Sequence, residues 1–191
     1  MVEKSTTLAY IIGVALGDGN LSCPNGRATR LRVTCDVKYP DIIVEIKDAL
    51  IKLFPTNRVS IVTNRKESCI DISVYSNKLN DYIPWKVGKG SKIEQQAHVP
   101  DWILKEVKFS NACLKGLLQT DGSIYTDRNY LMVNFTNLIK PLVDDVYKMI
   151  EVLQFRPKLY QSTQKNGNIK YVVRVSKDVQ NFINSIELSK T

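Results

Sequence analysis

The pattern of apolar and polar residues predicts a short series of helices and strands in the first part of this chain. Ser5-Thr6-Thr7 are good N-cap residues, and the apolar run from Leu8 to Leu16 predicts a helix that Gly17-Asp18-Gly19 breaks. Two strands should follow, the clearer at residues 30–37, where apolar and polar residues alternate. The same signals predict further strands at 57–64 and 68–76, and helices at 40–54 and 77–85.

The order of elements then repeats. Residues 110–120 predict an apolar helix that ends at Asp121-Gly122, and residues 178–187 a closing helix. Between them the pattern predicts a strand at 130–136, a helix at 138–154, and a hairpin of strands 156–163 and 168–176 around Asn166-Gly167.

The sequence therefore predicts an α+β fold made of two copies of helix, two strands, helix, two strands, helix, related by a pseudo-twofold axis. Duplex DNA presents the same symmetry to its readers. One continuous α+β domain without internal symmetry is the alternative.

A basic, glycine-bearing segment, residues 86–92, separates the two copies and is typical of a flexible connector. We therefore expect an N-terminal half at residues 1–85, a linker at 86–98 and a C-terminal half at 99–191.

Each copy opens on a similar motif. Residues 11–19 read IIGVALGDG and residues 114–122 read LKGLLQTDG, so both have an internal glycine and a terminal Asp-Gly. Both resemble the LAGLIDADG motif, although Leu16 and Gln119 replace its first aspartate. The segments 17–21, 119–124 and 99–103 also resemble this family, and the resemblance spans the chain from Leu8 to its last helix.

Small residues four apart let two helix backbones approach closely. Gly13 and Gly17 in one motif, and Gly116 and Thr120 in the other, should therefore form a helix interface that brings Asp18 and Asp121 together at the helix C-termini. Two carboxylates at helix C-termini repel each other unless cations lie between them.

Oxygen ligands of this kind select Mg²⁺. We expect Asp18, Asp121, Gly17 and Thr120 to supply the metal ligands, with Mn²⁺ or Ca²⁺ able to substitute in binding. The resemblance also implies a basic residue near each active site. Lys78 and Lys177, between the last strand and last helix of their copies, are the candidates.

The polar faces of the strands are the expected DNA-reading surface, since a two-stranded ribbon fits the major groove. The candidates in the first copy are Arg30, Arg32, Thr34, Arg58, Ser60, Asn64, Asp71, Ser73 and Tyr75. Those in the second copy are Tyr130, Asn134, Thr136, Lys158, Tyr160, Gln161, Lys170 and Arg174.

Charge supports a polyanionic partner, because 27 Lys and Arg residues against 19 Asp and Glu give a net charge of +8. The charge is spread evenly, at +4 in each half, which suits a folded surface that meets DNA along its whole length. Four scattered cysteines and one histidine argue against a zinc site and for reduced thiols. With no membrane span or targeting signal recognisable in the sequence, we expect a protein of the cytoplasm, the nucleoid or an organelle matrix.

The resemblance, together with the duplication and the charge, implies a LAGLIDADG homing endonuclease. We expect a monomer that binds a long pseudo-palindromic duplex and cuts both strands by metal-assisted hydrolysis without a small-molecule cofactor. A non-cleaving DNA-binding regulator or an RNA-splicing maturase of the same fold is the alternative. The two retained aspartates favour cleavage.

Overall fold

The computed structural model describes residues 3–63 and 68–190, and it contains the predicted repeat. The first half consists of α1 (Thr6–Asp18), β1 (Gly19–Ser22), β2 (Arg30–Asp36), α2 (Pro40–Leu53), β3 (Val59–Thr63), β4 (Cys69–Tyr75) and α3 (Leu79–Tyr82). A short helix, α4 (Asp101–Leu104), precedes the second half. That half consists of α5 (Val107–Asp121), β5 (Gly122–Asp127), β6 (Tyr130–Asn137), α6 (Lys140–Val152), β7 (Lys158–Thr163), β8 (Ile169–Val175) and α7 (Val179–Ser185).

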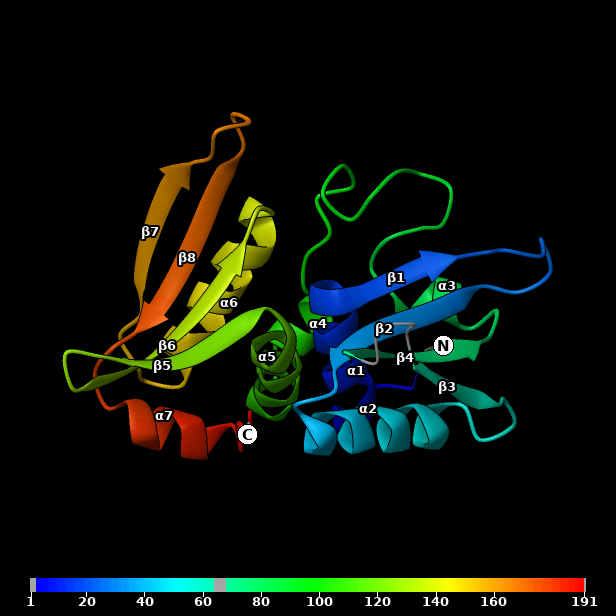
Figure 1. The fold of residues 1–191 in the computed structure, drawn as a ribbon, viewed down its shortest axis with the longest axis horizontal. Coiled ribbons are helices and arrows are strands. Elements are labelled where there is room, and N and C mark those ends of the chain that lie inside the picture. Colours follow the sequence, from blue (N-terminus) through cyan, green and yellow to red (C-terminus); the bar gives the residue numbers. More distant parts are fainter. Residues whose placement is uncertain (1–2, 64–67, 191) are drawn as a thin grey trace.

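Each half forms one four-stranded antiparallel sheet. The strand orders, β1-β2-β4-β3 and β5-β6-β8-β7, are the same permutation in the two copies. Figure 1 shows the two sheets on either side of the central pair α1 and α5, with the outer helices below and behind them. The α+β duplication expected from the sequence is confirmed.

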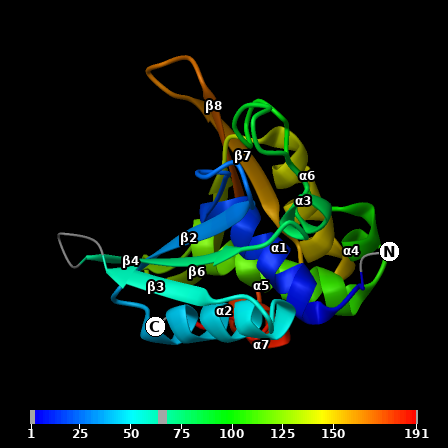
Figure 2. The ribbon, with the colours of Figure 1, turned by 90° about the vertical axis from the view of Figure 1, so that its right-hand side faces the viewer.

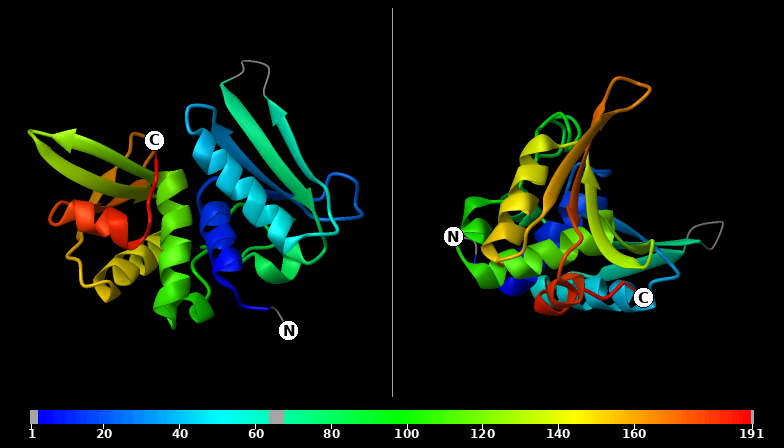
Figure 3. Two further views of the ribbon diagram at one scale, coloured as in Figure 1. Left: turned by 90° about the horizontal axis from the view of Figure 1, so that it is seen from below. Right: turned by 90° about the vertical axis from the view of Figure 1, so that its left-hand side faces the viewer.

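The central helices are buried because each is covered by the other half as well as its own. Every residue of α1 from Leu8 to Leu16 is buried. Its N-terminus is fixed by Ser5, whose hydroxyl accepts a hydrogen bond of 3.1 Å from the backbone N–H of Leu8. Figure 3 shows α1 and α5 side by side when the molecule is seen from below.

The small residues of the motifs lie where these helices cross. A Cβ atom added to Gly13 would come within 2.1 Å of the carbonyl oxygen of Cys113, and one added to Gly116 within 2.5 Å of that of Tyr10. At Gly17 the obstacle is the Thr120 hydroxyl, at 2.0 Å. Backbones can approach this closely only without side chains between them.

The strands alternate between a core face and an open face. In β2, for example, Leu31 and Val33 are fully buried, whereas Thr34 is exposed. The core faces pack on α2 and α6, whose first residues include Pro40 and Pro141. Proline suits a first helical turn because its missing N–H would have had no partner there.

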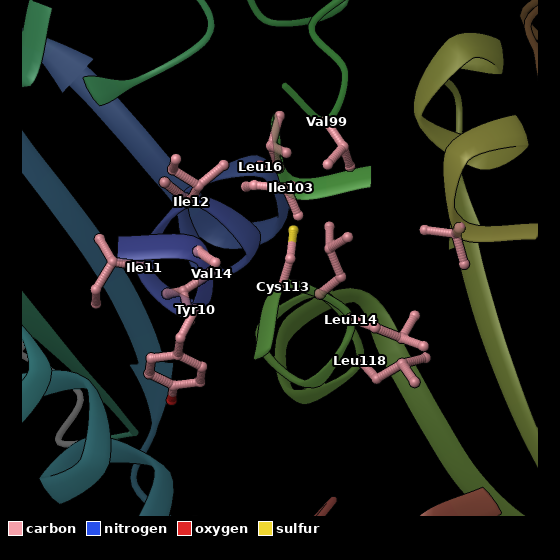
Figure 4. Close-up of a cluster of buried hydrophobic side chains, with 14 of the residues drawn as sticks. Tyr10, Ile11, Ile12, Val14, Leu16, Val99, Ile103, Cys113, Leu114 and Leu118 are labelled. Carbon is pink, nitrogen blue, oxygen red and sulfur yellow. The ribbon is translucent and has the colours of Figure 1, made fainter. Parts of the chain in front are cut away.

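Residues 86–98 form a loop that is folded on itself. The Gln95 side chain accepts a hydrogen bond from the backbone N–H of Lys86 and donates to the carbonyl oxygens of Lys86 and Gly90. The segment continues into Val99 and Ile103, which are fully buried. Figure 4 shows these two side chains beside Cys113 and Leu16, at the junction of α1 and α5.

None of the helices in the described ranges has the length and apolarity of a membrane-spanning segment. The four cysteines, all within those ranges, form no disulfide.

Candidate active site and DNA-binding face

Asp18 and Asp121 are the last residues of α1 and α5, and the helix crossing brings them together. Burial raises the pKa of Asp18, against the opposing charges of Lys92 and Lys190. Burial, together with the charge of Asp18, raises the pKa of Asp121 to about 6, while a hydrogen bond from Asn137 acts in the opposite direction. The two carboxylates therefore interact electrostatically and both lack full solvation.

Two lysines that the sequence analysis did not single out lie at these helix ends. The Lys92 ammonium donates to the carbonyl oxygens of Ala15, Leu16 and Gly17, the second of these at 2.9 Å. Because a helix C-terminus has unpaired carbonyls and partial negative charge, it attracts a cation.

Lys190 does the same for α5. Its ammonium donates to the carbonyl oxygens of Leu118, Thr120 and Gly122, that of Thr120 at 3.2 Å. Burial lowers the pKa of Lys92 and of Lys190, and the charges of the two aspartates counteract this.

Each carboxylate shares a cavity with the helix end and lysine of the other half. A cavity of about 330 Å³ is lined by Asp18 together with Thr120, Gly122 and Lys190. A second, of about 280 Å³, is lined by Asp121 together with Gly17 and Lys92. The four expected metal ligands are thus divided into two composite sites, and neither site is complete within one half.

Lys78 and Lys177 lie elsewhere. Both side chains are exposed, and neither lines the two cavities. The sequence did contain a signal for Lys92 and Lys190, since each of these lysines follows the last helix of its half. In the first half that signal was hidden in a segment that reads as a basic linker.

The residues of these cavities fit a divalent cation. Among the described residues no cluster of three Asp, Glu, His or Cys side chains could hold a metal by itself. Mg²⁺, however, is commonly bound through one or two carboxylates, with water and substrate phosphate completing its shell. The carbonyls of Gly17 and Thr120 already accept from ammonium ions, which shows that these oxygens attract cations.

The open face of the first sheet carries most of the expected DNA-binding residues of that half. Arg32 pairs with Asn20 on β1 and Ser73 on β4 in the strand register, and its guanidinium lies 3.6 Å from the Asp71 carboxylate. The residues on this face of the strands, or just before β3 in the case of Arg58, are Arg30, Arg32, Thr34, Arg58, Ser60, Asp71, Ser73 and Tyr75. Asn64 lies outside the described residues.

The second sheet presents a comparable face. The Arg174 guanidinium donates to Asn134 Oδ1 at 3.0 Å and lies 5.0 Å from the centre of the Tyr160 ring. Asn134 in turn donates to the hydroxyl of Tyr125, which the sequence analysis missed. The expected residues on this face are Tyr130, Asn134, Thr136, Lys158, Tyr160, Lys170 and Arg174.

Gln161 is the exception, because it lies on the opposite face of β7. It pairs with Tyr171, next to the Leu159–Val173 pair whose Val173 is buried in the core. Neighbouring residues of a strand point to opposite faces, so Tyr160 and Gln161 cannot share one. The expectation for Gln161 was wrong.

The fold, with two central helices that each end in Asp-Gly, is the LAGLIDADG homing endonuclease fold. Residues 108–187 match the family model described as a LAGLIDADG-like domain. The resemblance seen in the sequence to single-chain, two-motif LAGLIDADG homing endonucleases is confirmed.

Among solved structures, the homing endonuclease I-DmoI in complex with DNA and Mn matches with a TM-score of 0.68 and 21% identity, over 96% of this chain and 97% of that chain. Other structures of I-DmoI contain DNA with Ca or with Mg. Full-length DUF199/WhiA from Thermatoga maritima matches with a TM-score of 0.67 and 14% identity, over 100% of this chain and 58% of that one.

Two curated relatives are tRNA-splicing ligases RtcB. The chain is 26% identical to the Methanopyrus kandleri protein and 28% identical to the Pyrococcus abyssi protein, over 96% and 94% of its own length. It spans about a fifth of the length of these relatives, 21% and 22% respectively.

Proposed function

We propose that this protein is a site-specific double-stranded DNA endonuclease that cuts both strands with the help of bound divalent metal. The observation that carries the proposal is the pair of composite cavities, each combining a carboxylate from one half with a helix-end carbonyl and a lysine from the other. Such a site is assembled only when the two halves meet on the dyad. Duplex DNA places its two scissile phosphates about the same kind of axis.

The two sheets would bind the duplex on either side of the cut. Their open faces carry arginine, asparagine and hydroxyl side chains, which can donate to base edges and phosphates in the major groove. I-DmoI, which has the same fold, was solved in complex with its target DNA, and this supports the proposal. With both halves of the dyad in one chain, we propose that a monomer binds one duplex.

Asp18 and Asp121 would hold the metal, most simply Mg²⁺, with the carbonyls of Thr120 and Gly17 beside them. When bound, such an ion supplies Lewis-acid chemistry, polarising the phosphate and lowering the pKa of a water molecule. The protein's own part is to position the carboxylates, which the helix crossing fixes, and to keep the site partly dry. Lys92 and Lys190 add positive charge that can stabilise the charge developing on each phosphate.

The test is cleavage of a supercoiled plasmid carrying a target recovered from a randomised duplex library. Asp18→Asn and Asp121→Asn keep the size of the side chain and remove its charge, so DNA binding should persist and linear product should be lost. Asp41→Asn, an exposed position on α2, is the matched control and should cut like the parent. Full double-strand cleavage by Asp121→Asn would contradict the proposal and favour the non-cleaving regulator or maturase.

A further inference from the structure

Arg30, on the open face of the first sheet, is held by its neighbours on both sides. Its Nε donates to the Ser22 hydroxyl at 3.1 Å, and its guanidinium carbon lies 6.0 Å from the centre of the Tyr75 ring. These two neighbours belong to β1 and β4, the strands that pair with β2. Because Nε is engaged, the two outer guanidinium nitrogens form the donor pair that Arg30 presents to a ligand.

Arg174 is held in the same way on the second sheet. Its Nε donates to Asn134 on β6, and its guanidinium lies over the ring of Tyr160 on β7. Asn134 is itself fixed, because its amide donates to the Tyr125 hydroxyl on β5 at 3.0 Å. These contacts run through one residue of each of the four strands, and they also leave the two outer guanidinium nitrogens to face a ligand.

An arginine fixed in this manner matches guanine. Its two outer nitrogens can donate together to guanine O6 and N7, the commonest base-specific contact in the major groove. Fixing the side chain beforehand reduces the conformational entropy that is lost on binding. Arg32 differs, since its Nε has no acceptor among the described residues and its guanidinium lies 3.6 Å from the Asp71 carboxylate, which compensates its charge.

The position of these arginines in their sheets favours bases over phosphates. Both lie on inner strands, β2 and β8. Four strands span about 14 Å, which is more than the width of the major groove, about 12 Å, so the inner strands enter the groove and the edge strands lie at its rim. Figure 2 shows β3, β4 and the β7–β8 hairpin extending to the side opposite the N-terminus, so both sheets can meet one duplex.

The two arginines lie at different distances from the dyad. Arg174 is one residue beyond the strand pairing that contains Gly122, the glycine at the end of α5. Arg30 is three residues beyond the pairing that contains Gly19, the glycine at the end of α1. Figure 1 shows β1 and β5 leaving the central helices in opposite directions, so each step along these strands leads away from the dyad.

Neither arginine has an arginine as its counterpart in the other half. Counted from the same two glycines, Met132 takes the place of Arg30 in the second half, and Ser73 takes the place of Arg174 in the first. Two residues along a strand cover about 6.6 Å, which is close to the rise of two base pairs at about 3.4 Å each. The repeat is therefore broken at the residues best prepared to read a base.

We propose that the DNA target contains one guanine contacted by Arg30 and one contacted by Arg174, and that the first lies about two base pairs further from the centre than the second. At these positions the target departs from a palindrome. This inference rests on the proposed function for its substrate, a DNA duplex that spans both sheets, but it does not require cleavage.

The first test selects duplexes by binding alone, from a randomised library, with the full chain in EDTA so that no cutting occurs. Arg30→Ala should lose the preference for one guanine of the consensus and Arg174→Ala that for the other, each binding the parent's target at least about fivefold more weakly. Arg156→Ala, at an exposed arginine between α6 and β7, is the matched control and should keep the consensus. Uniformly weaker binding by the two variants, with the consensus unchanged, would assign them to phosphates and overturn the proposal.

A modified base separates base reading from a structural role. 7-Deazaguanine pairs with cytosine as guanine does but lacks the N7 acceptor. Placed at the guanine assigned to Arg174, it should weaken binding of the parent about fivefold and leave binding of Arg174→Ala unchanged. Equal losses for the parent and the variant would show that Arg174 does not contact this base, and would also overturn the proposal.

Relocation of one arginine tests the spacing. The double variant Arg174→Ser/Met132→Arg places the arginine of the second half where the first half has Arg30. The selected guanine should move outward, so the distance between the two guanines of the consensus should lengthen by about two base pairs. An unchanged distance would refute the register argument. If this variant does not fold, the positions of the two guanines relative to the cut ends of the parent's product decide the question.

These outcomes are distinguishable from failure of the proposed function. A chain that selects both guanines by binding but never cuts DNA would contradict the nuclease proposal alone. A chain that cuts a target in which neither guanine is required would contradict this inference alone.

Discussion

The two halves are alike at the last residues of their central helices and differ two residues earlier. Both helices end in aspartate followed by glycine, and both are capped by a lysine from their own half. Two residues earlier, Leu16 in the first motif packs in the apolar core, whereas Gln119 in the second joins a polar network.

That network crosses the dyad. The Tyr10 hydroxyl donates to Gln119 Oε1 at 2.7 Å, and Gln119 Nε2 donates to Glu45 at 2.9 Å. Lys115 forms an ion pair of 2.6 Å with the same carboxylate. The comparison shows that the repeat preserves the carboxylate, the lysine and the close helix contact. The residues that pack beside the carboxylates differ: an apolar side chain in the first half and a hydrogen-bond network in the second.

The largest expected effect comes from the lysines. Lys190→Met removes the cation from the cavity of Asp18, and Lys92→Met removes it from the cavity of Asp121. Loss of one such electrostatic group typically slows a reaction by about 10²–10³. Each variant should therefore cut one strand slowly and accumulate nicked plasmid, with opposite strands affected.

Lys78→Met and Lys177→Met are the matched controls, and strand-resolved gel analysis should find their cleavage unchanged. If the controls lose cleavage while Lys92→Met and Lys190→Met retain it, the earlier sequence-based assignment is right and the composite cavities are not the catalytic sites.

The glycines of the helix crossing should differ in importance. Alanine at Gly13 meets a backbone carbonyl, which cannot turn aside, whereas alanine at Gly17 meets the side chain of Thr120, which can. Overpacking typically costs about 1–3 kcal/mol, and we place Gly13→Ala at the upper end and Gly17→Ala at the lower. Urea unfolding would measure both, and equal losses would show that the crossing adjusts by moving the helices.

The two DNA-binding faces should also differ. Arg174 is held by the neutral Asn134 and Tyr160, whereas Arg32 faces the Asp71 carboxylate and would have to leave it to contact DNA. Truncation of a base-contacting arginine costs about 1–3 kcal/mol of binding. Arg174→Ala should lie near the top of that range and Arg32→Ala near the bottom, as measured by anisotropy on a target duplex. Unchanged affinity for both would mean that these faces do not bind DNA.

The smallest effect concerns pH and the carboxylate pair. Because the pKa of Asp121 is raised to about 6, the folded protein binds this proton more tightly than the unfolded chain does. The resulting stabilisation is present at pH 4 and is lost as the pH rises through about 6. At pH 7 without metal, Asp121→Asn should therefore raise Tm by about 2–4 °C, the equivalent of about 1 kcal/mol for a chain of this size.

Added Mg²⁺ should raise the Tm of the parent more at pH 7 than at pH 5, since a protonated carboxyl competes with the metal. A calorimetric scan in both buffers checks the two statements. An Asp121→Asn variant that is less stable than the parent at pH 7 would show that the folded structure stabilises the ionised Asp121 carboxylate rather than destabilising it.

The sequence alone determined the duplication, the motif helices and the open face of each sheet. These follow from local periodicity: the 3.6-residue helical repeat, the two-residue strand repeat, and small residues four apart at Gly13 and Gly17. Gln161 was misplaced although the same rule applied to it, since its neighbour Tyr160 had already been assigned to the open face.

Only the tertiary structure decided which groups meet across the dyad. The pairing of Asp18 with Lys190, and of Asp121 with Lys92, joins residues far apart in the chain, and no local pattern encodes such a contact. The repeat gives each half one carboxylate and one lysine, and the packing of the two halves places them in shared cavities.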